Sequence, residues 1–130
     1  LNPFKFQPFN LHALTVTVNG LPIPSDPLTM NYNDRDYQRA YLNTLGALGL
    51  DVGNNGLTLT PELWESAYNL YAFKLVPGPI KASIESTRMR GAVNLSFNFK
   101  QATPAPIEIL VYSETNRTLE ITANNKAFVV

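Results

Sequence analysis

Cysteine is absent from the sequence. Its absence excludes thiol catalysis, disulfide bonds and zinc sites with cysteine ligands, although it leaves the redox compartment undetermined. The only histidine, His12, lies among the apolar residues Leu11, Ala13 and Leu14, with no nucleophile or orienting acid near it in the sequence. We therefore interpret His12 as a surface or rim histidine, and not as part of a catalytic triad or a metal site.

A surplus of charge of either sign is also absent. Ten Lys and Arg balance ten Asp and Glu, and the sequence pI is about 6.8. Because no basic field is present to attract phosphates or anionic lipid, we expect neither specific nucleic-acid binding nor membrane binding. The chain also lacks an apolar run of about 20 residues that would span a bilayer, and no basic-then-apolar segment typical of a signal peptide opens it. It begins with Leu1 instead of Met, so we expect it to be part of a longer protein.

The composition favours a folded domain, because 45% of the residues are apolar and only 15% are charged. A length of 130 residues predicts a single domain over 1–130. Ten prolines and seven glycines divide the chain into short segments, many with the alternating pattern of half-buried strands. The predicted strands are 14–18, 68–76, 92–100, 107–114, 119–122 and 127–130. Asn19 and Gly20 predict a tight hairpin turn after the first of them, into residues 21–23, where proline makes the return strand irregular or an edge strand.

One segment departs from the alternating strand pattern and has apolar residues at helical spacing. Apolar residues at Tyr37, Tyr41, Leu45 and Leu48 predict an amphipathic helix over 34–48, with a cap at Asn33 or Asp34 and an end at Gly49. Further on, Thr60 and Pro61 predict a cap and first residue of a short helical turn that carries Leu63 and Trp64. The fold class is therefore predicted to be mainly β, an antiparallel β-sandwich or jelly roll with one inserted amphipathic helix.

Residues 51–62, DVGNNGLTLTPE, partly match the calcium-binding loop of an EF-hand. Asp51 and Glu62 fall at its first and last positions, but Gly53 and Leu59 occupy two of the positions between them that usually provide or organise oxygen ligands. Two carboxylates are too few for a tight calcium site. We interpret the stretch as a turn-rich loop that leads into the capped helical turn, and we expect added calcium to leave the melting temperature unchanged.

The remaining acidic residues have ordinary structural explanations. Asp34 and Asp36, near Arg35 and Arg39, suit the start of the predicted helix, where acids interact favourably with the helix dipole. Helix capping and a network of side chains spaced i to i+4 along the helix explain this cluster. Glu62 and Glu65 could be a pair of glycosidase carboxylates, but no second sign of an active site accompanies them, so we favour surface charge. We expect no catalytic, cofactor-binding or metal-binding residue, no cofactor and no enzymatic activity.

Aromatic residues are the most distinctive part of the composition: six Tyr, seven Phe and one Trp. Phe73, Phe97 and Phe99 fit the alternation of buried strand positions, so most of the aromatic residues are expected in the core. Exposed ones would serve at protein interfaces, or as stacking platforms in a carbohydrate-binding or other ligand-binding β-sandwich, with Trp64 as the first residue to test.

A series of short matches, in order along nearly the whole chain, resembles the C-terminal region of capsid-like proteins encoded by Polinton/Maverick-type elements and related DNA viruses. Residues 77–90 match the sequences of these proteins poorly, apart from Pro77. The matching residues are Asn2, Pro3, Phe4, Phe6, Val18, Asn19, Gly20, Pro24, Ser25, Pro27, Leu28, Tyr37, Arg39, Tyr41, Leu42, Gly53, Asn54, Tyr68, Leu70, Ala72, Phe73, Leu75, Pro77, Gly91, Leu95, Phe97, Ile109, Val111, Tyr112, Ser113, Glu114, Leu119, Glu120 and Ile121.

The resemblance implies the second jelly roll of a hexon-type, double-jelly-roll major capsid protein that assembles as trimers. It implies self-association and contact with other capsid proteins, in a virion or capsid assembled inside the host cell. Function would then lie in surface complementarity and not in a catalytic site. The alternative from a different class is the carbohydrate- or ligand-binding module.

Overall fold

The computed structural model of the chain describes residues 4–51, 59–75, 91–114, 119–121 and 127–129. Six strands, two α-helices and one turn of 3-10 helix lie within these residues. Their bounds are β1 Leu11–Val18, β2 Leu21–Pro22, β3 Leu28–Thr29, η1 Tyr32–Asp34, α1 Gln38–Leu48, α2 Pro61–Ser66, β4 Val93–Phe99, β5 Leu119–Ile121 and β6 Ala127–Val129.

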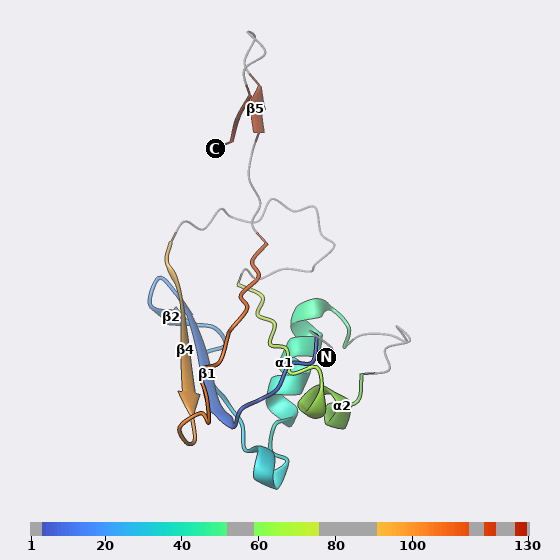
Figure 1. Cartoon of the computed structure of the whole chain (residues 1–130). Helices are drawn as coiled ribbons and strands as arrows, with labels where there is room; N and C mark the ends of the chain where they lie inside the picture. Colours follow the sequence, from blue (N-terminus) through green and yellow to red (C-terminus); the bar gives the residue numbers. More distant parts are fainter. Residues whose placement is uncertain (1–3, 52–58, 76–90, 115–118, 122–126, 130) are drawn as a thin grey trace.

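Strand β1 is the centre of a four-stranded antiparallel sheet (Figure 1). On one edge it pairs along its whole length with β4, from Val18 opposite Val93 to Leu11 opposite Phe99. On the other edge the short strands β2 and β3 pair with successive parts of β1. The sheet thus joins segments that lie about 80 residues apart in the sequence, as the register of β1 and β4 shows.

The turn between β1 and β2 confirms the predicted hairpin. Asn19 and Gly20 have positive φ angles of 52° and 82°, which two-residue hairpin turns of the I′ type require. Strand β2 is only two residues long and contains Pro22, in agreement with the expected irregular return strand.

Helix α1 begins later than the sequence indicates. The predicted start at residue 34 and the cap at Asn33 or Asp34 are wrong, because residues 31–36 form a closed loop of their own. The backbones of Asn31 and Asp36 bond to each other at 2.8 and 2.9 Å, and Arg35 adopts the left-handed conformation with φ 57°. The predicted end is confirmed: Gly49 has φ 68°, and its amide donates to the carbonyls of the last helical turn.

The start of helix α2 follows the prediction. Thr60 is its N-cap, and the Thr60 hydroxyl accepts a hydrogen bond of 3.2 Å from the amide of Leu63. Pro61 occupies the first helical position, where the missing N–H of proline costs nothing.

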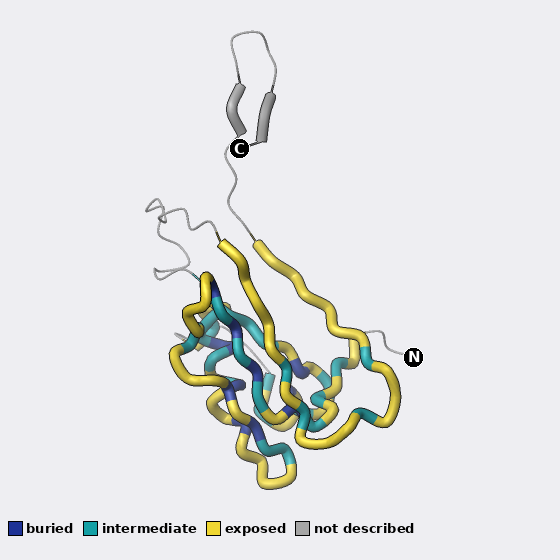
Figure 2. Tube along the Cα trace, turned by 90° about the vertical axis from the view of Figure 1, so that its left-hand side faces the viewer, coloured by how far each residue is buried: buried dark blue, intermediate teal, exposed yellow. Residues whose placement is uncertain are grey.

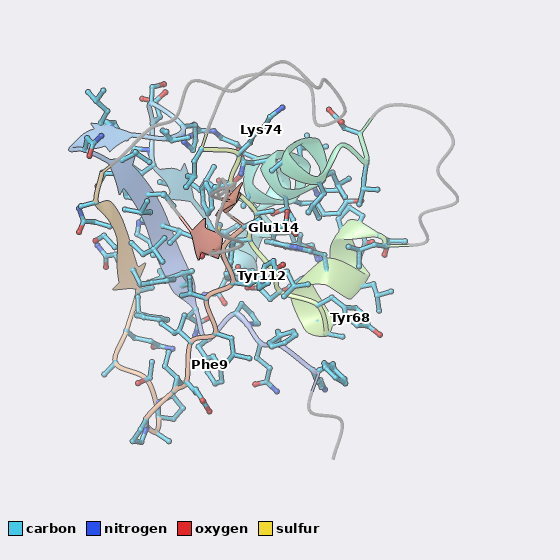
Figure 3. The ribbon with its side chains drawn as sticks, turned by 90° about the horizontal axis from the view of Figure 1, so that it is seen from above. Phe9, Tyr68, Lys74, Tyr112 and Glu114 are labelled. Carbon is cyan, nitrogen blue, oxygen red and sulfur yellow. The ribbon has the colours of Figure 1, made fainter. Side chains whose placement is uncertain are left out.

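The core lies between the sheet and a second layer that contains both helices (Figures 1 and 3). Its buried members are Leu11, Leu14, Leu28, Met30, Tyr37, Ala40 and Trp64. Helix α1 buries Tyr37, Ala40, Thr44 and Leu45, in keeping with the predicted stripe, whereas Leu48 at its end is exposed.

The predicted strand over 68–76 is not a strand where the structure describes it, through Leu75. Tyr68 forms a single parallel bridge with Phe6, and the amide of Leu70 turns back to Tyr68 O at 2.8 Å. Beyond this turn, carbonyls of the segment accept hydrogen bonds from helix side chains in place of a neighbouring strand. Leu70 O accepts from Trp64 Nε1 at 2.9 Å and from Thr44 Oγ1 at 3.2 Å, and Ala72 O accepts from Asn43 Nδ2 at 2.9 Å. Pairing with a strand would need these same carbonyls.

The predicted strand over 107–114 is also absent: the segment is extended, and within the described residues no strand pairs with it. Strand β4 confirms the prediction for 92–100 to within one residue at each end. Its alternation is confirmed at Phe97 and Phe99, which pack against the core, while Val93 and Leu95 on the same face are exposed.

Strands β5 and β6 confirm the last two predicted strands as an antiparallel pair, with Leu119 opposite Val129. They form a separate two-stranded sheet. Antiparallel strands with two helices agree with the predicted mainly β class.

Candidate functional site

The described residues contain no group of three or more His, Asp or Glu side chains that could hold a metal ion. Residues 52–58 of the EF-hand-like loop lie outside the described residues, so its interpretation stays a prediction. Among the helices that the structure describes, none has both the length and the apolar character needed to cross a bilayer.

His12 is an exposed residue of β1, as predicted. Its ring Nδ1 lies 3.1 Å from the backbone carbonyl of Met30, to which it donates in the tautomer that carries the proton there. The ring therefore joins β1 to the residue after β3, which is a structural role.

Glu62 is exposed and Glu65 is half-buried, and both take part in hydrogen bonds of helix α2. The Glu62 carboxylate accepts hydrogen bonds from its own backbone amide and from the Thr60 hydroxyl, which lowers its pKa. A general acid needs a raised pKa, so Glu62 has the wrong shift for that role. Glu65 accepts a 2.7 Å hydrogen bond from the hydroxyl of the buried Tyr37 and so joins α2 to the start of α1.

The charged cluster near residues 34–39 is also structural, although it does not form the predicted network along the helix. The Arg39 guanidinium donates to the backbone carbonyls of Pro27 and Asp26, at 3.0 and 3.2 Å. Asp34 accepts a short hydrogen bond from the Asn31 amide and closes the loop before α1. The predicted i to i+4 arrangement fails because the helix begins after both acids.

Trp64 lies at the centre of an aromatic cluster. Its side chain is 0% exposed, and its ring meets Tyr37, Tyr41 and Tyr71 with centroid distances of 5.9, 6.1 and 5.5 Å. A side chain without exposed surface cannot stack on a sugar, so the choice of Trp64 as a carbohydrate platform is wrong. The short helix α2 places the Trp64 ring in the core, between the sheet and the second layer. The sequence does not reveal this position.

The tyrosine hydroxyls of this cluster are hydrogen-bonded to one another and to nearby polar groups. Tyr32 and Tyr71 share a 2.6 Å bond, and Asn69 Nδ2 donates to the Tyr32 hydroxyl at 3.2 Å. Burial raises the pKa of Tyr32, of Tyr71 and of Tyr37, the last to about 12. These hydroxyls stay protonated near neutral pH and stabilise the second layer.

Two shallow hollows lie on the surface. One, of about 220 Å³, is lined by residues that include Ile23, Asn43 and Phe73, and it is smaller than the roughly 300 to 1,000 Å³ of typical ligand pockets. The other, of about 390 Å³, lies beside the exposed Phe9 and is lined by Gln7, Pro8, Asn10, Glu65 and Ser66.

Residues 91–114 are mostly exposed (Figure 2), and six of the fourteen exposed large apolar residues of the described chain lie among them. Ile109, Leu110, Val111 and Tyr112, here called the apolar strip, are 45%, 72%, 65% and 84% exposed. Successive side chains of an extended chain point to opposite sides, so the strip is apolar on both sides. Soluble monomers rarely leave such a run uncovered, so the strip is our candidate interaction site.

Tyr112 is the most exposed large apolar residue of the described part of the chain (Figure 3). Its hydroxyl donates to Glu114 Oε1 at 3.1 Å, and this bond is the main reason that its pKa is raised. The alternation of 107–114 predicts a strand, and the sequence gives no sign that the strand would be left without a partner.

A comparison with known proteins gives one distant relative, an uncharacterised protein of Caenorhabditis elegans. It is 22% identical to the chain over 122 residues, which are 92% of the chain and 29% of the relative. The chain thus spans less than a third of that protein's length. No protein family matches the chain, and no solved structure does.

Proposed function

We propose that the chain is part of a capsid-type structural protein that self-associates through the surfaces of a jelly-roll β-sandwich. The full protein would be a double-jelly-roll capsid subunit that assembles as a trimer inside the host cell. The apolar strip is the single observation that carries this proposal.

The strip has the composition of an interface core. Interface cores are depleted in charge and rich in aromatic residues, and Ile109 to Tyr112 contain three aliphatic side chains and one tyrosine without a charge. Burying apolar surface contributes about 25 cal/mol per Å², so contact with another subunit would stabilise an assembly.

The second layer favours a sandwich as the parent architecture. Tyr71 and Phe73 of the segment 68–75 pack against the core cluster that contains Leu11 and Leu14 of β1. Residues 71–75 and 107–114 contain no helix, turn or bend, so strands of a second sheet could include them. Subunits that add strands to these segments would close a jelly roll.

Two further points support the proposal. It agrees with the resemblance to capsid-like proteins of Polinton/Maverick-type elements. The relative from C. elegans is about three times as long as the matched region, which leaves room for a second domain of similar size.

Light scattering after size-exclusion chromatography, over about a hundredfold range of chain concentration, tests the proposal. We expect the mass to rise with concentration, and we expect Leu110→Glu to reduce this rise. Leu42→Glu on α1 is the matched control, because Leu42 is also more than half exposed. A chain that stays monomeric throughout, or a loss of association only in the control, contradicts the proposal.

Carbohydrate binding is the second candidate, and the hollow beside Phe9 favours it. An exposed aromatic ring next to the amide groups of Gln7 and Asn10 provides a stacking face and hydrogen-bonding groups. Specific binding on a glycan array that Phe9→Ala removes, with the chain monomeric, would favour this candidate over the capsid role.

A further inference from the structure

Among the residues that the structure describes, none pairs with one of the two edges of strand β4. The amide of Asn19 donates to Ala92 O at 3.0 Å, and the amide of Lys100 donates to Asn10 O at 3.1 Å. In an antiparallel pair the residues that bond to the neighbour alternate with residues whose groups point away. The even-numbered residues of β4 therefore bond to β1, and the groups of Val93, Leu95, Phe97 and Phe99 point to the open edge.

The other side of β1 supports this assignment. Val16 of β1 lies opposite Leu95 of β4, and the backbone groups of these two residues do not bond to each other. The carbonyl of Val16 instead accepts a hydrogen bond of 2.8 Å from the amide of Ile23, on the other edge of β1. Within the described part of the chain, no backbone hydrogen bond reaches the outward groups of β4.

This edge lacks the features that usually prevent pairing with another chain. Exposed edge strands are commonly protected by charged side chains, proline or a bulge. The seven residues of β4, VNLSFNF, contain no charge, no proline and no glycine. The irregularity in the pairing with β1 lies between Leu11 and Ala13 on β1, near one end of β4.

The sequence of β4 is symmetric in polarity about Ser96. Apolar residues occupy 93, 95, 97 and 99, Asn occupies 94 and 98, and Ser96 is in the middle. When two copies pair in antiparallel fashion about Ser96, Leu95 lies opposite Phe97 and Val93 opposite Phe99. Asn94 lies opposite Asn98, and the two Ser96 residues face each other on a two-fold axis.

We infer that β4 pairs with β4 of a second copy of this chain, so that two four-stranded sheets join into one. In this register the odd-numbered residues of the two β4 strands form the hydrogen-bonded pairs. These are the residues whose backbone groups point to the open edge, so the register and the hydrogen-bonding pattern agree. The pairing also covers Val93 and Leu95, which are 49% and 37% exposed in the single chain. An interface of this kind is isologous and closes as a dimer.

The self-complementary strand distinguishes a second copy from other occupants. A different protein would need no symmetry in β4, and the segment 107–114 of the same chain is not symmetric, since it has Glu108 near one end and Tyr112 with Glu114 near the other. The inference deepens the proposed function, on which it rests, by naming the surface through which two copies meet. In a trimeric capsid protein it would link subunits of neighbouring trimers.

Cysteine cross-linking tests the inference, because the chain has no cysteine of its own. Side chains on a two-fold axis in a pair without hydrogen bonds lie close enough for a disulfide. We expect Ser96→Cys to give a covalent dimer under mild oxidation, on a non-reducing gel. Asn94→Cys and Asn98→Cys, on the same face, are matched controls: each alone should give at least about tenfold less dimer, because like positions lie four residues apart, or about 13 Å. A mixture of these two variants should form the mixed dimer.

Equal cross-linking of all three variants would overturn the inference, as would failure of Ser96→Cys to form a dimer. Pairing of β4 with segment 107–114 of its own chain would instead give an intramolecular disulfide in the double variant Ser96→Cys/Leu110→Cys, which also overturns it. Light scattering separates the two proposals. A chain that associates through the apolar strip without a Ser96→Cys dimer retains the proposed function and loses only the β4 contact.

Discussion

Residues 4–51 and 59–75, taken together, differ from residues 91–114 in how much apolar surface the single chain buries. In the first region the buried residues run from Leu11 to Asn69, and in the second none is buried. The first region covers its aromatic rings with two helices and satisfies its buried hydroxyls with hydrogen bonds. The second contributes Phe97 and Phe99 to that core but leaves its own apolar residues in water.

The difference indicates a division of roles. The first region is the part of the molecule that stabilises the fold, and the second region is the part available to partners. Changes in the first region should therefore alter the free energy of unfolding, and changes in the second should alter association.

The largest expected effect is that of Trp64→Ala. The substitution removes a fully buried ring and the hydrogen bond to Leu70 O, so we expect a loss of about 3 to 5 kcal/mol in the free energy of unfolding. Urea denaturation followed by circular dichroism measures it. The neighbouring Leu63→Ala, at a position that is 39% exposed, should cost about 1 kcal/mol or less. Equal losses would mean that α2 does not bury Trp64.

Tyr37→Phe should have the next largest effect. It removes the hydrogen bond to the Glu65 carboxylate, and bonds to charged groups typically contribute about 1.5 to 3 kcal/mol. Tyr68→Phe, at an exposed position, is the matched control and should leave the free energy of unfolding unchanged. Denaturation at neutral pH compares the two variants.

The pH dependence provides a separate test of Tyr37. Burial, and next the hydrogen bond to Glu65, raise its pKa from 10.0 to about 12. Because the folded pKa lies above the unfolded one, the contribution of Tyr37 is fully present below pH 10 and is lost as the pH rises from 10 to about 12. Tyr37→Phe should make stability less dependent on pH in this window. If the dependence of stability on pH is the same in this variant, the Tyr37 hydroxyl is not buried.

A smaller effect is expected at the end of α1, where two glycines should respond in opposite directions. Gly49→Ala places a Cβ at φ 68° and should cost about 1 kcal/mol. Gly46→Ala lies inside the helix, where the nearest atom to a new Cβ is Asp51 Oδ2 at 3.5 Å, an ordinary contact. It should stabilise the protein by about 0.5 to 1 kcal/mol. Thermal denaturation of both variants gives the signs, and equal signs would contradict the helix end.

The smallest effect on stability should be that of Leu110→Ser in the apolar strip. Since the side chain is 72% exposed, we expect a change within about 0.5 kcal/mol, measured at a concentration where the chain is monomeric. Leu45→Ala, at a buried position of the first region, should cost about 2 to 5 kcal/mol in the free energy of unfolding. A large loss at Leu110 would mean that the strip is part of the fold.

Local patterns in the sequence predicted much of the fold. The turn at Asn19 and Gly20, the end of α1 at Gly49, the cap at Thr60 and the strands β1, β4, β5 and β6 follow from residue types whose backbone preferences act over a few positions. The late start of α1 was missed because the loop closed by Asn31 and Asp36 competes with helix formation. The burial of Trp64 was missed because its place depends on contacts with Tyr37, Tyr41 and Tyr71, far along the chain.

The sequence by itself determined which segments are extended, which are helical and where several of the turns lie, because backbone preferences are local. It also determined the symmetry of β4 and the apolar character of residues 109–112. Only the tertiary structure decided that, among the described residues, no strand pairs with the outer edge of β4 or with residues 107–114. The reason is that strand pairing needs a partner backbone, and a segment's own residues do not specify whether its chain provides one.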